Sequence, residues 1–100
     1  MQKATVLFIL SSETDDYDSE GGLAVSERMQ ITFMQARLAR IASQRWKLSI
    51  AEVARIFDQY QVFRHIENCY GLYHVEGDEA IWEDLQPYLR AKGCAYAQAG

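Results

Sequence analysis

Apolar residues recur at helical spacing in the segment that follows Ser26. The members of this stripe are Ile31, Met34, Leu38, Ile41 and Ala42. Steps of three and four residues place such side chains on one face of an α-helix. Ser26 is a favourable N-cap, and Glu27 stands in the first turn, where a negative charge interacts well with the helix dipole. The pattern predicts a helix from residue 27 to about Gln44.

Two further helices are expected after this one. Ser49–Glu52 forms a capping box, with serine at the cap and glutamate three residues later. The helix that it opens carries its apolar residues on one face, and these are Val53, Ile56, Phe57 and Tyr60. A third, short helix is predicted around Val62, Phe63 and Ile66. Gly71 is its expected end, because glycine is favoured just after a helix.

The segment before the last helix leaves two structures open. Leu72–Val75 and Ala80–Trp82 are short apolar runs on either side of a Gly-Asp turn, which is typical of a small hairpin. A loop that enters the last helix directly is the alternative. Proline is tolerated in the first turn of a helix but not in its interior. The last helix is therefore expected to have Asp84 as N-cap and Pro87 at its third position, and to end near Lys92.

The N-terminal quarter of the chain has a different pattern. Thr5–Leu10 is β-branched and apolar, which favours a short strand or an extended arm, and residues 11–22 are polar, acidic and end in Gly-Gly. Such a strand must pair within the fold, with a second copy or with a partner.

The expected organisation is an N-terminal strand and loop (1–26), a helical domain (27–92) and a flexible tail (93–100). The expected fold class is mainly α. It is a compact bundle of four short helices with an N-terminal β-strand or arm and, in one of the two variants above, a small hairpin near residues 72–82.

Length and composition fit one globular domain. The chain has 100 residues, of which 49% are hydrophobic and 24% are charged. The apolar run Ala4–Leu10 has seven residues and no small-residue cleavage site behind it, whereas a membrane helix needs about twenty. A cytoplasmic protein is therefore expected. Cys69 and Cys94 belong to no motif and are expected to be reduced thiols, with a disulfide between them as the alternative.

The net charge of −4 hides an uneven distribution. Residues 1–26 and residues 66–100 each carry a net charge of −4, whereas residues 27–65 carry +4. One interpretation is internal compensation, in which the acidic segments lie near the basic helix and screen it. The other is a basic face that docks an acidic surface of a partner. The charge pattern alone leaves both open.

Several residues occur together in an order that is familiar. Phe33 lies in the first helix, Leu48–Phe57 has the pattern L-S-x-x-E-V-x-x-x-F, and Tyr70–His74 is followed three residues later by Gly77. An acidic and apolar ending, Ile81–Leu89, completes the series. With these features, residues from about 31 to 90 resemble a short bacterial helical domain family of unknown function.

The resemblance also carries an expectation about function. Genes of this family often lie beside genes for proteins that look like ADP-ribosyltransferase toxins. The resemblance therefore implies an antitoxin, immunity or accessory protein that binds such a partner. The chain departs from the family pattern at Tyr73, where leucine is usual, at Pro87, and over residues 1–26, which have no counterpart.

The sequence contains no recognisable catalytic, metal or cofactor motif. It has no glycine-rich phosphate loop, no nucleophile elbow and no paired zinc ligands. His65 and Cys69 are four residues apart on a helix and would supply two ligands at most. Neighbouring carboxylates such as Glu83 and Asp84 point apart on a helix. We therefore expect no enzyme, no catalytic residue and no cofactor.

The remaining candidates are residues that could bind another protein. Phe33 lies off the apolar stripe beside Arg37 and Arg40, and aromatic residues and arginine are what interface anchors are made of. His74 either fixes a turn by bonding a backbone group or contacts a partner, and three aromatic residues around it are either core or interface: Tyr70, Tyr73 and Trp82.

The expected function is a non-catalytic protein-binding module of the antitoxin or immunity type. A winged-helix operator-binding regulator and a homodimeric structural domain are the alternatives. Nucleic acid is disfavoured as a partner because the third helix offers only Arg64 and His65 against Glu67, and phosphate contacts require a cationic surface.

Overall fold

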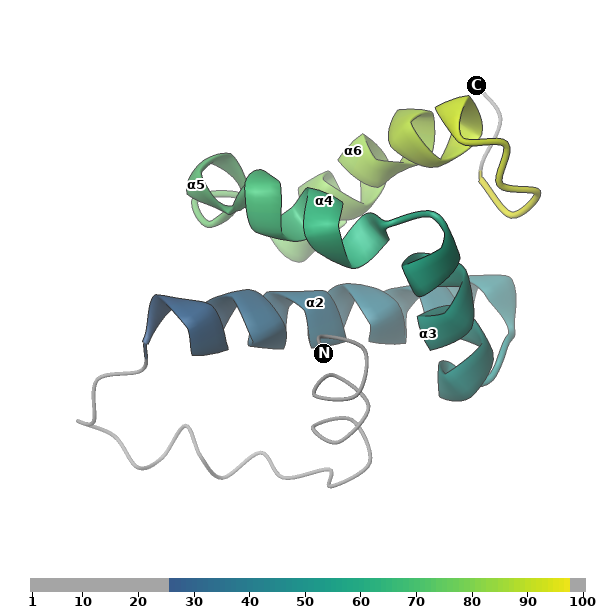
Figure 1. Cartoon of the computed structure of the whole chain (residues 1–100), viewed down its shortest axis with the longest axis horizontal. Helices are drawn as coiled ribbons and strands as arrows, with labels where there is room; N and C mark the ends of the chain where they lie inside the picture. The colour runs from purple at the N-terminus through teal and green to yellow at the C-terminus, as the bar shows by residue number, and fades with distance from the viewer. Residues whose placement is uncertain (1–25, 98–100) are drawn as a thin grey trace.

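The computed structural model describes residues 26–97, and the regular secondary structure in this part of the chain is all helical (Figure 1). Its helices are α2 (Glu27–Trp46), α3 (Ile50–Gln59), α4 (Val62–Asn68), α5 (Tyr70–Tyr73) and α6 (Asp78–Ala91). The mainly α fold class is thus confirmed for residues 26–97, with five helices in place of the four expected. The N-terminal strand predicted at Thr5–Leu10 lies outside the described residues.

The long helix α2 is the element against which the others pack. It contacts α3, α4 and α6, and Figure 1 shows α4, α5 and α6 along one side of it with α3 near its C-terminal end. Ser26 caps it by accepting a hydrogen bond from the backbone N–H of Met29. The helix ends at Trp46, two residues beyond the predicted end, because Lys47 adopts a left-handed conformation with φ of 58°. The predicted N-cap is confirmed.

The second predicted cap is also confirmed. The Ser49 hydroxyl accepts a hydrogen bond of 3.1 Å from the backbone N–H of Glu52, which satisfies one of the free donors of the first turn of α3. The face predicted to be apolar is buried at Val53, Ile56 and Phe57. The capping box therefore identified the start of this helix correctly.

Gly71 does not end a helix, and this corrects the sequence-based prediction. α4 ends at Asn68, and a further turn, α5, includes Gly71 itself. Gly71 does not adopt the left-handed conformation for which a glycine is favoured after a helix. The chain continues to turn because Tyr70 and Tyr73, one turn apart, are both buried. Burial of two aromatic rings outweighs the low helix propensity of the glycine between them.

Of the two structures left open near residues 72–82, the hairpin is wrong, and the loop that enters the last helix directly is the one observed. The predicted start of the last helix is also wrong. α6 begins at Asp78, six residues before Asp84, and has Gly77 as its N-cap. Pro87 therefore lies inside the helix. The cause is a buried helical stripe, made up of Ile81, Trp82, Leu85 and Leu89. Burying such side chains contributes about 1.5–3 kcal/mol each, whereas one interior proline costs about 3 kcal/mol, so the helix forms in spite of Pro87.

Three ion pairs join α2 to the elements that follow α3. They are Arg28–Glu67 at 2.7 Å, Arg37–Asp78 at 3.0 Å and Arg45–Glu79 at 2.6 Å. Each connects a cation of the basic segment to an acid of the third segment of the chain. Part of the uneven charge pattern is therefore compensated internally, although exposed pairs of this kind contribute little stability.

Below these ion pairs lies one hydrophobic core. Trp82, Tyr73 and Phe57 are its largest fully buried side chains, and Gln35 reaches into it to donate a 2.9 Å hydrogen bond to the Phe63 carbonyl of α4. After α6 the chain packs back on this core, where Cys94 is buried and the Tyr96 ring stacks on Trp46 with centroids 5.2 Å apart. Cys69 and Cys94 are both free thiols.

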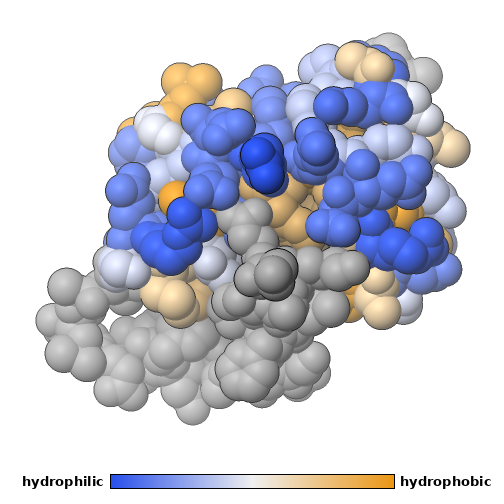
Figure 2. Space-filling model, in the orientation of Figure 1, coloured by the Kyte–Doolittle hydropathy of each residue, from blue (hydrophilic) through white to orange (hydrophobic). Residues whose placement is uncertain are grey.

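The described surface is mostly polar. Hydrophilic residues dominate the face shown in Figure 2, and hydrophobic residues occupy smaller areas between them. None of the helices in residues 26–97 has both the length and the hydrophobicity that crossing a membrane requires.

Candidate functional site

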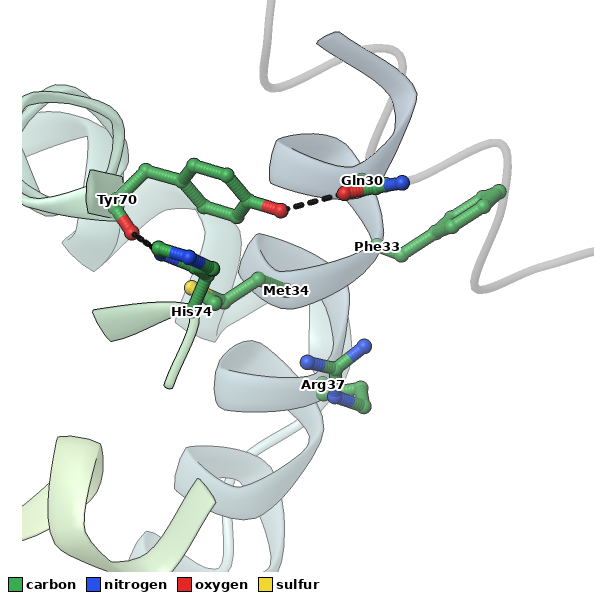
Figure 3. A pocket seen from close by; sticks show the side chains of 6 residues that line it. All are labelled: Gln30, Phe33, Met34, Arg37, Tyr70 and His74. Atoms are coloured by element: carbon green, nitrogen blue, oxygen red, sulfur yellow. Dashed lines mark hydrogen bonds between the residues drawn. The ribbon is translucent and has the colours of Figure 1, made fainter. Parts of the chain in front are cut away.

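An open pocket of about 210 Å³ lies between α2 and the α5 turn (Figure 3). The α2 residues that line it are Gln30, Phe33, Met34 and Arg37, and the α5 side contributes Tyr70 and His74. On α2 these positions follow the steps i, i+3, i+4 and i+7, which place them on one face of a helix. The pocket lies where this face meets the first residue of α5, Tyr70, and the residue that follows its end, His74.

Hydrogen bonds hold the α5 side of the pocket in place. The Tyr70 hydroxyl donates a 2.6 Å hydrogen bond to the Gln30 Oε1 atom, which connects α5 to α2. The Nδ1 atom of His74 lies 3.1 Å from the Tyr70 carbonyl oxygen. Because a carbonyl only accepts hydrogen bonds, Nδ1 is the donor in this contact. The two rings stack with centroids 5.4 Å apart.

The α2 side combines an apolar floor with a cation. Met34 is only 3% exposed, whereas Phe33 is half-buried and in Figure 3 points away from Tyr70 and His74 at the rim of the pocket. The Nε atom of Arg37 bonds both carboxylate oxygens of Asp78, at 3.0 and 3.2 Å. This contact uses Nε alone, so the two terminal amino groups of Arg37 have no bond to any residue in 26–97.

The pocket brings together four of the seven residues predicted to bind a partner, namely Phe33, Arg37, Tyr70 and His74. Arg40 is exposed one turn further along α2 and does not line it. Tyr73 and Trp82 are 1% and 0% exposed and belong to the core. Of the two interpretations of His74, the structure contains the first, a hydrogen bond to a backbone carbonyl that fixes a turn.

Sequence reasoning missed two residues of the pocket, Gln30 and Met34. Met34 belongs to the predicted apolar stripe and was assigned to the core alone, although it also forms the pocket floor. Gln30 shares one flank of the predicted helix with Phe33 and Arg37, and this spacing was the signal that could have added it to the candidates.

A second cluster of titratable side chains surrounds His65. Its ring stacks on Tyr88 with centroids 4.0 Å apart, the Tyr73 hydroxyl lies 3.2 Å from His65 Nε2, and the Cys69 Sγ atom lies 3.9 Å from the same nitrogen. Burial lowers the pKa of His65 and raises the pKa values of Tyr73 and Tyr88. In residues 26–97 no three His, Cys, Asp or Glu side chains gather in a way that could hold a metal ion.

The lowered pKa of His65 predicts how stability depends on pH. Burial lowers this pKa below the ordinary value of 6.5, and the opposing charge of Asp84 is the weaker effect. The unfolded chain therefore binds the proton more readily than the folded one. The contribution of His65 is fully present above about pH 6.5 and is lost as the pH falls through its folded pKa.

The variant His65→Phe keeps a ring against Tyr88 and removes the titration. We expect the wild type to lose more unfolding free energy than this variant between about pH 7.5 and about pH 5, as measured by urea denaturation. Equal losses in the two proteins would show that His65 titrates normally in the folded state.

Comparison with known proteins identifies one family. A model of proteins of unknown function, DUF3791, matches residues 33–92, which include every pocket residue except Gln30 and extend to the end of α6. The match nearly coincides with the segment, about 31–90, that resembles a domain of unknown function, and it confirms that part of the resemblance. No curated protein and no solved structure matches the chain.

Proposed function

We propose, from the premise that this chain belongs to the DUF3791 family of proteins of unknown function, that it is a non-catalytic protein-binding module. A side chain of the partner is anchored in the pocket between α2 and α5. The surface around the pocket covers part of the partner, so the mechanism is occlusion rather than chemistry.

The observation that carries this proposal is the size and construction of the pocket. Small-molecule sites usually enclose about 300–1,000 Å³, whereas this pocket has about 210 Å³. It suits one side chain better than a metabolite or a nucleotide. Its lining of Tyr70, Phe33 and Arg37 is of the kind that dominates the binding energy of protein interfaces. The hydrogen bond of 2.6 Å from Tyr70 to Gln30 preorganises the site, which reduces the entropy lost on binding.

The class of partner follows from the family resemblance. The gene neighbourhood that the resemblance implies makes an ADP-ribosyltransferase-like toxin the proposed partner, and an antitoxin or immunity protein the proposed role. The proposed location is the cytoplasm.

A winged-helix regulator has less support than this proposal. Its wing was the hairpin expected near residues 72–82, and this segment instead contains the end of α5, a turn and the start of α6. The third helix of the series, α4, presents Arg64 beside Glu67, and Glu67 is occupied by Arg28. Little cationic surface is left there for phosphate contacts.

Co-purification tests the proposal. The chain, tagged at its C-terminus and expressed from its own chromosomal position, is expected to retain one protein in near-stoichiometric amount, encoded near its gene. The variant Phe33→Ala is expected to retain much less, because an anchoring aromatic ring contributes about 2 kcal/mol or more. The control Arg55→Ala changes an exposed residue of α3 and is expected to retain as much as the wild type. Retention of nothing but nucleic acid, or of a second copy of the chain, would contradict the proposal.

A further inference from the structure

We propose that the partner element bound at this site is an acidic peptide segment with one large apolar side chain. The apolar side chain enters the pocket, and flanking carboxylates bind the terminal amino groups of Arg37 and the guanidinium of Arg40. This inference rests on the proposed function and specifies the chemistry of the partner.

The first argument is the charge of the outer face of α2. Phe33, Arg37, Arg40 and Gln44 follow the steps i, i+4, i+7 and i+11, and they form the stripe opposite the buried Gln35. We call these four residues the outer stripe. It contains no acidic residue, since Glu27 is the only acid of α2 and lies about two turns before Phe33. The outer stripe therefore presents two cations and an aromatic ring.

The second argument is that one of these cations, Arg40, has no ion pair within the described residues. Arg28 and Arg45 of the same helix are paired with Glu67 and Glu79. Arg40 is exposed and forms no ion pair with any residue from 26 to 97. Arg40 therefore holds no pair of described helices together through an ion pair. Binding an acidic ligand is the role that we assign to its charge.

The third argument is the orientation of Arg37. Asp78 bonds only its Nε atom, through oxygens at 3.0 and 3.2 Å. The pairing keeps the guanidinium at the edge of the pocket and leaves its two terminal amino groups available as a fork. Such a fork matches the two oxygens of a carboxylate. Asp78 thus positions Arg37 without neutralising its ability to bind a second acid.

The fourth argument is that the pocket requires an apolar group between the charges. Met34 forms a buried floor and the Tyr70 ring forms a wall, and neither can satisfy a buried carboxylate. A volume of about 210 Å³ accommodates one large apolar side chain. A purely acidic chain would therefore leave the pocket unfilled. A purely apolar one would leave the terminal amino groups of Arg37 and the guanidinium of Arg40 without partners.

A selection from a random peptide library tests this inference on the full chain. Peptides of about twelve residues displayed on phage are selected on the immobilised wild type. The enriched peptides are expected to contain several Asp or Glu residues around one Leu, Ile, Phe, Tyr or Trp. Their affinities are then measured by fluorescence anisotropy for the wild type, Arg40→Glu and the control Arg55→Glu, which carries the same charge change on α3.

Arg40→Glu is expected to weaken binding at least about tenfold, because like charges repel across an interface, and Arg55→Glu to change it less than about twofold. The binding is also expected to weaken as ionic strength rises. Enriched peptides without acidic residues, equal effects of the two variants, or no enrichment at all would overturn the inference.

Two other occupants would also overturn it, and each has its own signature. A second copy of the chain would give a dimer in light scattering that Arg40→Glu dissociates. If the occupant were the acidic residues 13–20 of the same chain, a Glu-specific protease would cleave them faster in Arg40→Glu than in Arg55→Glu. The affinity for the peptides would be unchanged. The peptide selection does not depend on the co-purification, because the library contains no natural partner. If acidic peptides are enriched but no protein co-purifies, the proposed function is contradicted and this inference still holds.

Discussion

Replacing Trp82 by alanine is expected to lower the free energy of unfolding by about 3–5 kcal/mol, the usual cost of removing a large aromatic side chain from a core. Trp82 is 0% exposed and lies in the first half of α6. Its ring lies 5.6 Å from that of Trp46, and the guanidinium carbon of Arg45 lies 5.9 Å from its centroid. A loss of this size is a large part of the total stability of a domain, which is about 5–15 kcal/mol.

Urea denaturation followed by circular dichroism measures this loss. Tyr96→Ala is the matched control, because Tyr96 is 44% exposed and also stacks on Trp46, and its removal is expected to cost about 1 kcal/mol. If Trp82→Ala cost no more than Tyr96→Ala, Trp82 would lie at the surface. That result would restore the sequence-based expectation that Trp82 contacts a partner.

Replacing Pro87 by alanine is expected to raise the free energy of unfolding by about 2 kcal/mol. Pro87 is the tenth of the 14 residues of α6 and is exposed. It has no N–H to donate to the carbonyl of Glu83, and proline in a helix interior is about 3 kcal/mol less favourable than alanine. The gain is reduced by about 0.4–1 kcal/mol because proline also restricts the unfolded chain. Since the ring is exposed, its removal leaves no cavity.

Glycine provides the control for this substitution. Pro87→Gly restores the same N–H but has a helix propensity about 1 kcal/mol below that of alanine, so its gain is expected to be smaller by about that amount. A decrease of stability in Pro87→Ala, measured by the same denaturation, would show that the proline is not strained inside α6. The sequence-based prediction that the last helix begins after Asp84 would then be the better description of this segment.

The helices with local signals were predictable from the sequence. Ser26 and Ser49 each accept the hydrogen bond that their position in the sequence predicts, because an N-cap depends on residues within one turn. The buried face of α3 followed from the spacing of Val53, Ile56 and Phe57 for the same reason. Four of the pocket residues were also identified, through the types of residue that interfaces use.

The sequence left the segment from Gly71 to Trp82 open between a hairpin and a loop before a helix, because its structure depends on contacts with distant residues. Gly71 and the Gly77-Asp78 pair are strong local signals for a stop and a turn, but the burial of Tyr73 and Trp82 against other helices decides the outcome. The same limit applies to the site. Tyr70, Tyr73 and Trp82 have similar chemistry, and only the packing shows that Tyr70 lines a pocket whereas the other two fill the core.

The affinity of the co-purified partner for the full chain and for Phe33→Ala is the most direct test of the central claim, that the α2–α5 pocket binds another protein. Because Phe33 is half-buried, urea denaturation of both proteins is used first to find conditions in which each is folded. We predict that its affinity, measured by isothermal titration calorimetry, falls at least about tenfold, which corresponds to about 1.4 kcal/mol. An affinity within about twofold of the wild type, or an equal loss in the control Arg55→Ala, would contradict the claim.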